Sequence, residues 1–327
     1  MKILLTGANG FVGSHILDSL RRRGLPVRLL LRPTSDSRFI EPQLPTVERC
    51  VGSWSDPQVL RTALEGVTHV VHCAGLTRAR RSSEFHAVNC GLTQALVTAV
   101  NERPQQVQRF LQISSLAASH PAPRHAPARE EDPSEPVSEY GKSKLAAEQA
   151  VLERCRVPFT ILRPPAVYGP RDNAFLFFFQ LAKARLVPKF LGGVQHLSMV
   201  LAQDLAEAAA TCLSHPKAEG RIYFVASPDV LTPTEFGREV ARQMELSTLV
   251  FPFPVPLLWP ICVLSEGLAR LTGHAAMLNR QKYAELSASG WVCDSTRLRQ
   301  ETGFVASTPL REGIAQTLAW YRQAGCI

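Results

Sequence analysis

The first half of the chain alternates short apolar runs with longer stretches in which apolar residues recur every three or four positions. A short apolar run is typical of a strand buried on both faces, and the wider spacing is typical of an amphipathic helix. Residues 13–23 follow the helical spacing, with Ile16, Leu17 and Leu20 on one face. The predicted strands are Lys2 to Thr6, Val27 to Leu31, Thr46 to Val51, His69 to Cys73, Arg109 to Ser114 and Phe159 to Arg163. This alternation predicts an α/β fold with a doubly wound parallel sheet covered by helices.

After Pro164 the pattern loosens, because proline and phenylalanine become frequent and the predicted helices are shorter. The later predicted elements are a helix over Asp204 to Leu213, a strand over Arg221 to Ala226 and a last helix that begins at Pro309 and ends before Gly325. We expect residues 1–164 to form the sheet domain, with a segment at about 200–227 returning to it. Residues 165–327 then form mainly a smaller, interleaved C-terminal domain.

Two apolar segments in the second half are open to more than one interpretation. Leu249 to Leu264 contains four prolines and is shorter than the roughly 20 apolar residues that a spanning helix needs, so no transmembrane segment is predicted. It either packs inside the second domain or forms an apolar lid or membrane-facing surface. Phe175 to Phe179 either lines a site for a hydrophobic ligand or packs in a core.

Composition narrows the class of protein without naming a function. The chain has 327 residues, of which 45% are hydrophobic and 20% charged, and this excludes a chain that is disordered throughout. The formal net charge is +8, but the arginine clusters at 21–23 and 78–81 are short and no nucleic-acid motif accompanies them. We therefore interpret the excess charge as solvated surface and expect no nucleic-acid partner.

The eight cysteines are scattered, without a CxxC pair or a histidine at ligand spacing. They predict neither a metal site nor a disulfide framework. Because the N-terminus runs directly into a predicted strand, no signal peptide is expected, and the chain fits a reducing cytoplasm.

Three glycines follow the first strand and open the first helix, in the run from Thr6 to Gly13. Gly7 permits a tight turn, Gly10 lets the backbone approach a pyrophosphate, and Gly13 allows close helix packing. The helix N-terminus adds amide donors and a positive dipole. This context predicts a Rossmann-type dinucleotide site. Its loop residues are Gly7, Asn9, Gly10, Phe11, Val12 and Gly13.

The GxxGxxG spacing and the run TGANGFVGSHI resemble the extended short-chain dehydrogenase/reductase family, of the NAD-dependent epimerase/dehydratase type. Further segments at ordered positions extend the resemblance over essentially the whole chain, and VRLLLRP together with the serine pair is most similar to dihydroflavonol reductase and 3β-hydroxysteroid dehydrogenase relatives. The resemblance implies that residues 1–164 bind NAD(P). The residues that it places beside the cofactor outside the glycine loop are Cys73, Ala74, Gly75, Ser114, Tyr140, Lys144 and Pro164. It also implies a homodimer through the helices that carry Asn89 and Tyr140.

The end of the second strand predicts which nicotinamide cofactor is preferred. NAD enzymes usually place an acid there, on the ribose 2′-hydroxyl, whereas this strand ends in Leu31-Arg32. The Arg32 guanidinium suits a 2′-phosphate, and Arg38 follows closely. We predict NADP(H) as the preferred cofactor; NAD(H) remains the alternative if Arg32 is an ordinary loop residue.

Tyr140 and Lys144 lie four residues apart in a predicted helix and therefore face one pocket. A nearby cation is expected to lower the pKa of the tyrosine hydroxyl. Ser114 and Ser115 end the fifth strand, where a parallel sheet opens into its ligand crevice. By resemblance, Ser115 polarises the reacting carbonyl, Tyr140 gives or takes the proton, and Lys144 tunes Tyr140 and holds the nicotinamide ribose.

Two departures from the family pattern bear on the substrate. Nucleotide-sugar epimerases and dehydratases of the family carry an asparagine where this chain has Pro165, and an arginine, two residues after the equivalent of Gln195, where it has Leu197. A nucleotide diphosphate would thus lose two partners. We predict an NADP-dependent oxidoreductase for a small or apolar ketone or secondary alcohol. The alternatives are a nucleotide-sugar 4-epimerase or dehydratase with bound NAD, and a non-catalytic NADP-binding sensor.

Overall fold

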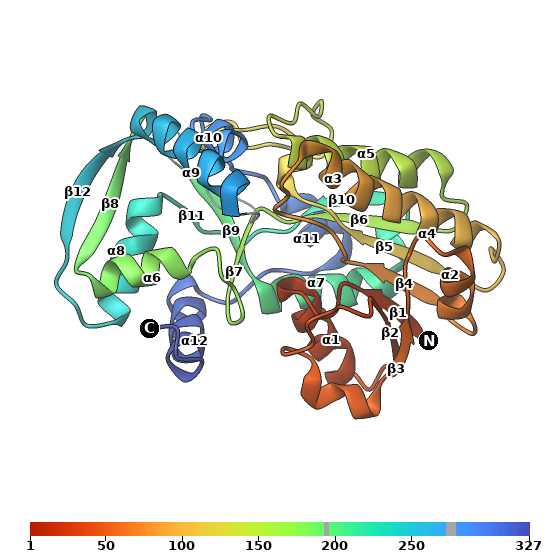
Figure 1. Cartoon of the computed structure of the whole chain (residues 1–327). Helices are drawn as coiled ribbons and strands as arrows, with labels where there is room; N and C mark the ends of the chain where they lie inside the picture. The colour runs from red at the N-terminus through yellow and green to blue at the C-terminus, as the bar shows by residue number, and fades with distance from the viewer. Residues whose placement is uncertain (193–195, 273–278) are drawn as a thin grey trace.

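The computed structural model of the chain describes residues 1–192, 196–272 and 279–327. Helices cover both faces of a large parallel sheet, and a smaller lobe packs beside the carboxyl ends of its strands (Figure 1). Gln195 of the sequence motif lies outside the described residues.

The large sheet follows the predicted strands closely. Its members are β1 (Ile3–Thr6), β2 (Val27–Leu31), β3 (Glu48–Val51), β4 (His69–His72), β5 (Arg109–Ile113), β6 (Phe159–Arg163) and β10 (Arg221–Phe224). They lie in the order β10-β6-β5-β4-β1-β2-β3, and all neighbours are parallel. The order reverses between β1 and β4, where such sheets open a ligand crevice. The predicted doubly wound fold is confirmed.

Helices bury the two faces of this sheet in alternation. One face is covered by α1 (Phe11–Arg22) and α7 (Ala202–Ser214), and the other by α2 (Pro57–Leu64), α4 (Gly91–Asn101) and α5 (Glu139–Arg154). Along β1, Ile3 and Leu5 join the first core, whereas Leu4 joins the second. Because successive strand side chains point to opposite faces, burial of both faces explains why Ile3, Leu4 and Leu5 are all apolar.

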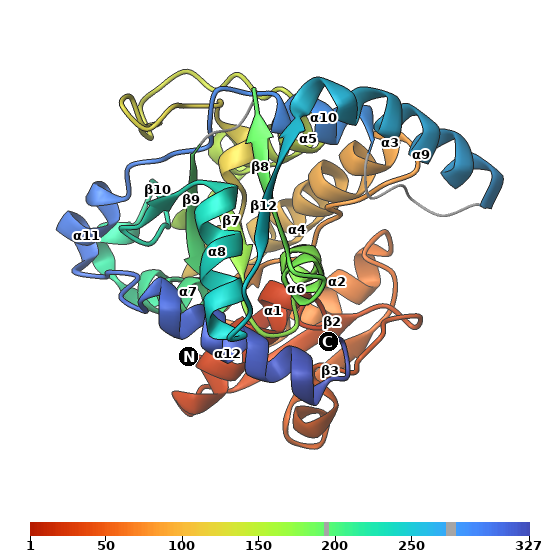
Figure 2. The ribbon, with the colours of Figure 1, turned by 90° about the vertical axis from the view of Figure 1, so that its left-hand side faces the viewer.

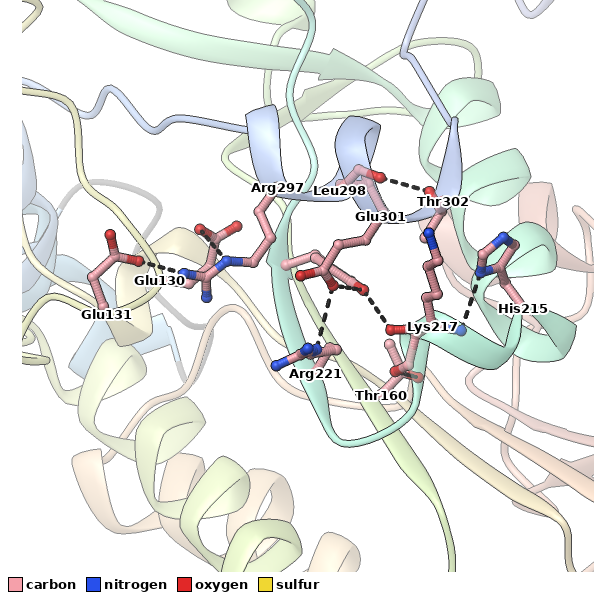
Figure 3. Close-up of polar contacts among 12 residues, drawn as sticks. Glu130, Glu131, Thr160, His215, Lys217, Arg221, Arg297, Leu298, Glu301 and Thr302 are labelled. Atoms are coloured by element: carbon pink, nitrogen blue, oxygen red, sulfur yellow. Dashed lines mark hydrogen bonds and ion pairs between the residues drawn. The ribbon is translucent and has the colours of Figure 1, made fainter.

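The chain returns to the large sheet after its first excursion into the small lobe. Helix α7 packs on α1, and β10 pairs with β6 at the edge of the sheet. Helix α11 (Thr296–Thr302) then fastens this edge through polar contacts, which Figure 3 shows in detail. Arg297 pairs with Glu131 at 2.6 Å, and Glu301 pairs with Arg221 at 3.3 Å.

The small lobe is built from short strands and helices around an aromatic core. Its strands are β7 (Ala166–Tyr168), β8 (Leu186–Leu191), β9 (Leu197–Leu201), β11 (Val230–Leu231) and β12 (Leu249–Pro254), and its main helices are α6 (Leu176–Lys183), α8 (Pro233–Gln243) and α12 (Leu310–Gln323). Phe179 is fully buried, and Phe175 and Phe178 contact the ring of Phe236. Most of the 175–179 patch therefore packs in this core, and Phe177 remains exposed.

The apolar stretch 249–264 does not pack inside the lobe as a whole. It forms β12, the short turn η5 (Val255–Leu257) and the start of α9 (Leu258–Thr272). Pro260 is tolerated because it lies in the first turn of α9, where its missing N–H costs no hydrogen bond. Val255, Leu258 and Cys262 are buried, but most of the other apolar side chains on this segment are exposed or half-buried. In the described residues, no helix is long and apolar enough to cross a membrane.

A buried ion pair ties helix α5 to the sheet. Glu148 of α5 is fully buried and accepts hydrogen bonds from the Arg163 guanidinium of β6, the shortest at 2.6 Å. The Ser114 hydroxyl, just after β5, donates to the same carboxylate. Each charge is compensated inside the protein, so the arrangement fixes the position of α5 relative to β5 and β6.

Removing one partner of this pair should cost much more stability than removing an exposed one on the same helix. We expect Glu148→Ala to lower the free energy of unfolding by about 3–5 kcal/mol, because Arg163 would stay buried without its counter-charge. The matched control is Glu139→Ala, which breaks a partly exposed pair with Lys142 and should cost about 1 kcal/mol or less. Denaturant unfolding of both variants measures the difference. Equal losses would show that the pair does not anchor α5.

Candidate active site

The glycine loop packs tightly against the end of β4. Gly7 has φ +74°, and a Cβ placed on it would lie 2.6 Å from the Ala74 nitrogen. A Cβ on Gly13 would lie 2.0 Å from the Gly7 carbonyl oxygen. Both positions therefore require glycine for close backbone approach, as the sequence predicts. The Gly7 carbonyl also accepts a hydrogen bond from the Gly10 N–H at 3.0 Å, which closes the turn.

Gly10 differs from the other two glycines, because no nearby protein atom excludes a side chain at this position. It is exposed, and the nearest atom to a Cβ placed there is the Gly7 oxygen at 3.4 Å. Gly10 is also the N-cap of α1, and the first turn of that helix, from Phe11, contains no acidic side chain. Free amide donors at the helix start, beside an open glycine, fit the pyrophosphate of a dinucleotide.

A buried histidine fixes the entrance to this loop. His72 hydrogen-bonds the Thr6 hydroxyl through Nδ1 at 2.8 Å and the Thr93 hydroxyl through Nε2 at 2.9 Å. The Thr6 hydroxyl also accepts from the Ala74 N–H at 3.2 Å. Burial lowers the pKa of His72 to about 3, so the ring is neutral at physiological pH. Thr6 thereby holds the end of β1 against the end of β4.

The two arginines after β2, Arg32 and Arg38, differ in whether an acidic side chain pairs with the guanidinium. Arg38 is tied to Asp36, with its Nε 2.6 Å from the carboxylate, and its guanidinium lies over the Phe39 ring. Arg32 is exposed, and its backbone N–H donates to the Ser35 hydroxyl at 3.0 Å. Within the described ranges, its guanidinium has no ion-pair partner. Of the two, Arg32 is the arginine that is available for an additional anion.

The serine and tyrosine hydroxyls meet beyond the end of β5. Ser115 precedes the short turn η3 (Leu116–Ala118), and its Oγ accepts from the Ala117 N–H at 3.1 Å. It also shares a hydrogen bond with the hydroxyl of Tyr140 in the first turn of α5. The Leu116 N–H donates to the Pro164 carbonyl at 2.8 Å, so the end of β6 supports the same turn.

The pKa of Tyr140 is raised, not lowered as expected from Lys144. Burial raises it to about 12; the hydrogen bond with Ser115 opposes this shift, and the charge of Glu285 adds to it. Lys144 is itself buried, and its Nζ donates to the Ile113 carbonyl at 2.7 Å. Burial lowers the pKa of Lys144. In this structure desolvation therefore dominates the pKa of Tyr140, and Tyr140 holds its proton at neutral pH.

Asn89 has a structural role beside the site. It lies in the π-helical turn η2 (His86–Cys90), which follows α3 (Ser82–Phe85). Its side chain accepts from the Leu76 N–H at 2.7 Å and donates to the Ser143 hydroxyl at 2.9 Å. A Cβ on Gly75 would meet its Oδ1 at 3.0 Å. Asn89 thus joins the loop after Cys73 to helix α5.

Two residues near Tyr140, Phe85 and Glu285, are not predicted by any sequence motif. Phe85 of α3 contacts the Tyr140 ring edge-on, with 6.0 Å between centroids. Glu285 approaches from α10 (Arg280–Leu286) and acts on the Tyr140 hydroxyl through its charge. The chain from Leu249 onward carries no motif that places α10 here, so only the folded structure could identify Glu285.

The sequence is similar to a known enzyme family and to several of its members. The model of the NAD dependent epimerase/dehydratase family matches residues 3–226. A ceramide reductase of Caulobacter vibrioides is 29% identical over 324 residues, which span 99% of this chain and 95% of that protein. A UDP-glucose 4-epimerase of Vibrio cholerae is 27% identical over 341 residues, which span 98% of this chain and 96% of that protein.

The fold is also that of solved family structures. The UDP-glucose 4-epimerase of Thermus thermophilus, in complex with NAD, aligns with a TM-score of 0.77 at 23% identity and covers 99% of this chain and 100% of that one. The similar proteins include both reductases and epimerases. Because the family model matches more than half of the chain and the similar proteins are reductases and epimerases, the chain is an enzyme of the NAD dependent epimerase/dehydratase family, within the extended short-chain dehydrogenases/reductases.

Proposed function

We propose that the protein is an NADP(H)-dependent oxidoreductase that interconverts a small or apolar ketone and its secondary alcohol. The observation that carries the proposal is the contact between the Ser115 and Tyr140 hydroxyls beyond the end of β5, with Tyr140 protonated. A protonated phenol beside a second hydroxyl suits a carbonyl oxygen that must gain a proton.

The residues that would hold the cofactor follow from the geometry of the crevice. The loop from Gly7 to Gly13 and the start of α1 fit the pyrophosphate, and Arg32 fits a 2′-phosphate. Cys73, Ala74 and Gly75 border the crevice at the end of β4, together with Lys144. When bound, the nicotinamide supplies or accepts a hydride.

The proton transfer would then be performed by the side chains of this chain. Because Tyr140 keeps its proton at neutral pH, it can donate that proton to the oxygen of a ketone as the alcohol forms. The Ser115 oxygen is occupied by the Ala117 N–H, which leaves its own hydrogen available to the same substrate oxygen. Lys144, held by the Ile113 carbonyl, would position the ribose and stabilise the negative charge left on Tyr140.

The substrate class follows from what the crevice lacks. Pro165 offers no side-chain hydrogen bond, and Leu197 packs against the aromatic core of the small lobe. A diphosphate would find neither of its expected partners at these positions. The similarity to a ceramide reductase supports a substrate with apolar chains.

A 4-epimerase acting on a nucleotide sugar is the second candidate, favoured by the similarity to UDP-glucose 4-epimerases. It would use Tyr140 and Ser115 in the same way but would recycle its cofactor. A non-catalytic NADP-binding sensor is a third. Thermal-shift measurements with NADPH, NADH and UDP-glucose separate the first two: stabilisation by UDP-glucose without stabilisation by NADPH would overturn the reductase proposal.

We further propose a cytoplasmic location and a homodimer through the helices that carry Asn89 and Tyr140. All eight cysteines, which lie in the described residues, are free thiols, and this suits a reducing compartment. The dimer rests on the family resemblance.

Arg32 and Arg38 form a matched pair for testing the cofactor preference. We expect Arg32→Ala to weaken NADPH binding by about tenfold or more and to leave NADH binding nearly unchanged, because a charge-assisted contact to the 2′-phosphate is lost. Arg38→Ala should change neither affinity much, since Asp36 already engages Arg38. Fluorescence titration with both nucleotides measures this. An equal loss for NADPH and NADH in Arg32→Ala would refute the assignment.

Tyr140→Phe tests the proton transfer. We expect kcat for NADPH-dependent reduction of long-chain ketones to fall by about 10²–10⁴-fold, because the substrate oxygen loses its proton donor. The NADPH dissociation constant should stay within a few-fold of the wild-type value, which serves as the internal control for folding. Unchanged turnover would remove Tyr140 from the mechanism, and unchanged effects in cells would favour the sensor.

A further inference from the structure

Helix α9 presents an apolar face that the rest of the chain does not cover. Exposed apolar side chains of α9 and of the preceding turn occupy the broad side of the helix opposite its buried residues. Leu257, Ile261, Leu264 and Leu268 recur at helical spacing, and Trp259 and Val263 flank them. Leu264 is 68% and Leu268 63% exposed, whereas Leu258 and Cys262 on the opposite side are buried. An uncovered apolar stripe of this kind marks an interaction surface.

Helix α9 lies at the outer edge of the molecule beside α10 and close to α3, as Figures 1 and 2 show from two directions. Helices α9 and α10 are packed together. The Arg280 guanidinium of α10 pairs with Glu266 of α9 at 3.0 Å. Gln281 of α10 donates to the Ser82 hydroxyl at the start of α3 at 3.1 Å. The apolar stripe, α10 and the start of α3 therefore form one continuous rim.

This rim is basic. Arg78, Arg80 and Arg81 immediately precede Ser82 and are exposed, and in the part of the chain that the structure describes none of them is in an ion pair. On α10, the Arg280 and Lys282 side chains are also at least half exposed. Arg280 pairs with Glu266, and Lys282 pairs with Glu285. An apolar helix face that carries a tryptophan and has arginines beside it is the pattern of a helix that lies in a membrane interface.

We propose that the α9 face docks on a phospholipid bilayer that contains anionic lipids, with Arg78, Arg80 and Arg81 contacting the headgroups. Helix α9 has 15 residues and is thus about 22 Å long, shorter than the roughly 30 Å of a hydrocarbon core. The helix would lie on the surface and not cross it.

The docking surface borders the reacting hydroxyl. Phe85 at the end of α3 contacts the Tyr140 ring, and Glu285 of α10 acts on the Tyr140 hydroxyl. A molecule seated on a bilayer through α9 would therefore bring the substrate side of the crevice to the lipid surface. The docking itself is independent of the proposed reaction; only the delivery of an apolar ketone from the bilayer rests on that function.

Vesicle co-sedimentation tests the docking. We expect the wild-type protein to sediment with vesicles of phosphatidylcholine and phosphatidylglycerol, and much less with phosphatidylcholine alone. Leu264→Glu together with Leu268→Glu should reduce binding by at least about tenfold, because two apolar side chains that would enter the bilayer become charged. The matched control is Val305→Glu, at an exposed apolar residue outside the rim, which should bind as the wild type does.

The arginines provide a second, electrostatic test. Arg78→Glu with Arg81→Glu should weaken binding to the anionic vesicles by roughly fivefold or more per residue, and raising the salt concentration should weaken wild-type binding. Thermal melting confirms that the variants are folded. Reduction of a short, water-dispersed ketone by Leu264→Glu/Leu268→Glu should equal that of the wild type, so that failure of docking and failure of the reductase proposal are distinguished.

Three results would overturn the proposal. In the first, the wild-type protein fails to bind either vesicle. In the second, the leucine variant binds as tightly as the wild type. In the third, sedimentation equilibrium shows that the leucine variant converts a dimer to a monomer while no vesicle binding occurs, and the α9 face is then an interface between two copies of this chain.

Discussion

The position of the proposed reacting groups depends on the buried contact between Glu148 and Arg163. Helix α5 carries Tyr140 and Lys144, while Ser115 follows β5, so the site exists only if the helix and the sheet keep a fixed relation. Glu148 supplies that relation by accepting from Arg163 of β6 and Ser114 after β5. Both charged side chains are almost completely shielded from water, and each is therefore held to its partner.

The glycine loop is also held in a fixed position relative to the sheet. Here the fixed relation comes from close backbone packing, because Gly7 and Gly13 leave no room for a Cβ. Thr6 and His72 add neutral hydrogen bonds between β1 and β4. The proposed site thus lies between two rigid contacts, the Glu148–Arg163 ion pair on one side and the close backbone packing at Gly7 and Gly13 on the other.

The sheet and the glycine loop could be predicted from the sequence because their signals are local. An apolar run encodes a buried strand, and glycine spacing encodes a turn, within a few neighbouring residues. The partner of Glu148 could not be predicted, since a charge in a helix does not reveal which side chain of the next strand will meet it. The approach of Glu285 to Tyr140 could not be predicted because it joins segments far apart in the chain. The exposure of Leu264 and Leu268 could not be predicted either, because an apolar run has the same pattern whether or not another element covers it.

We propose that the protein carries out net reduction and does not recycle its cofactor. Isotope tracing tests it most directly: the protein is incubated with a long-chain ketone and NADPH deuterated at C4, in each stereoisomer, and the products are analysed by mass spectrometry. We expect that one of the two stereoisomers yields an alcohol with one deuterium, and that one NADP⁺ forms for each alcohol. Conversion of UDP-glucose to its 4-epimer without consumption of the nucleotide, and no deuterium in any alcohol, would contradict it.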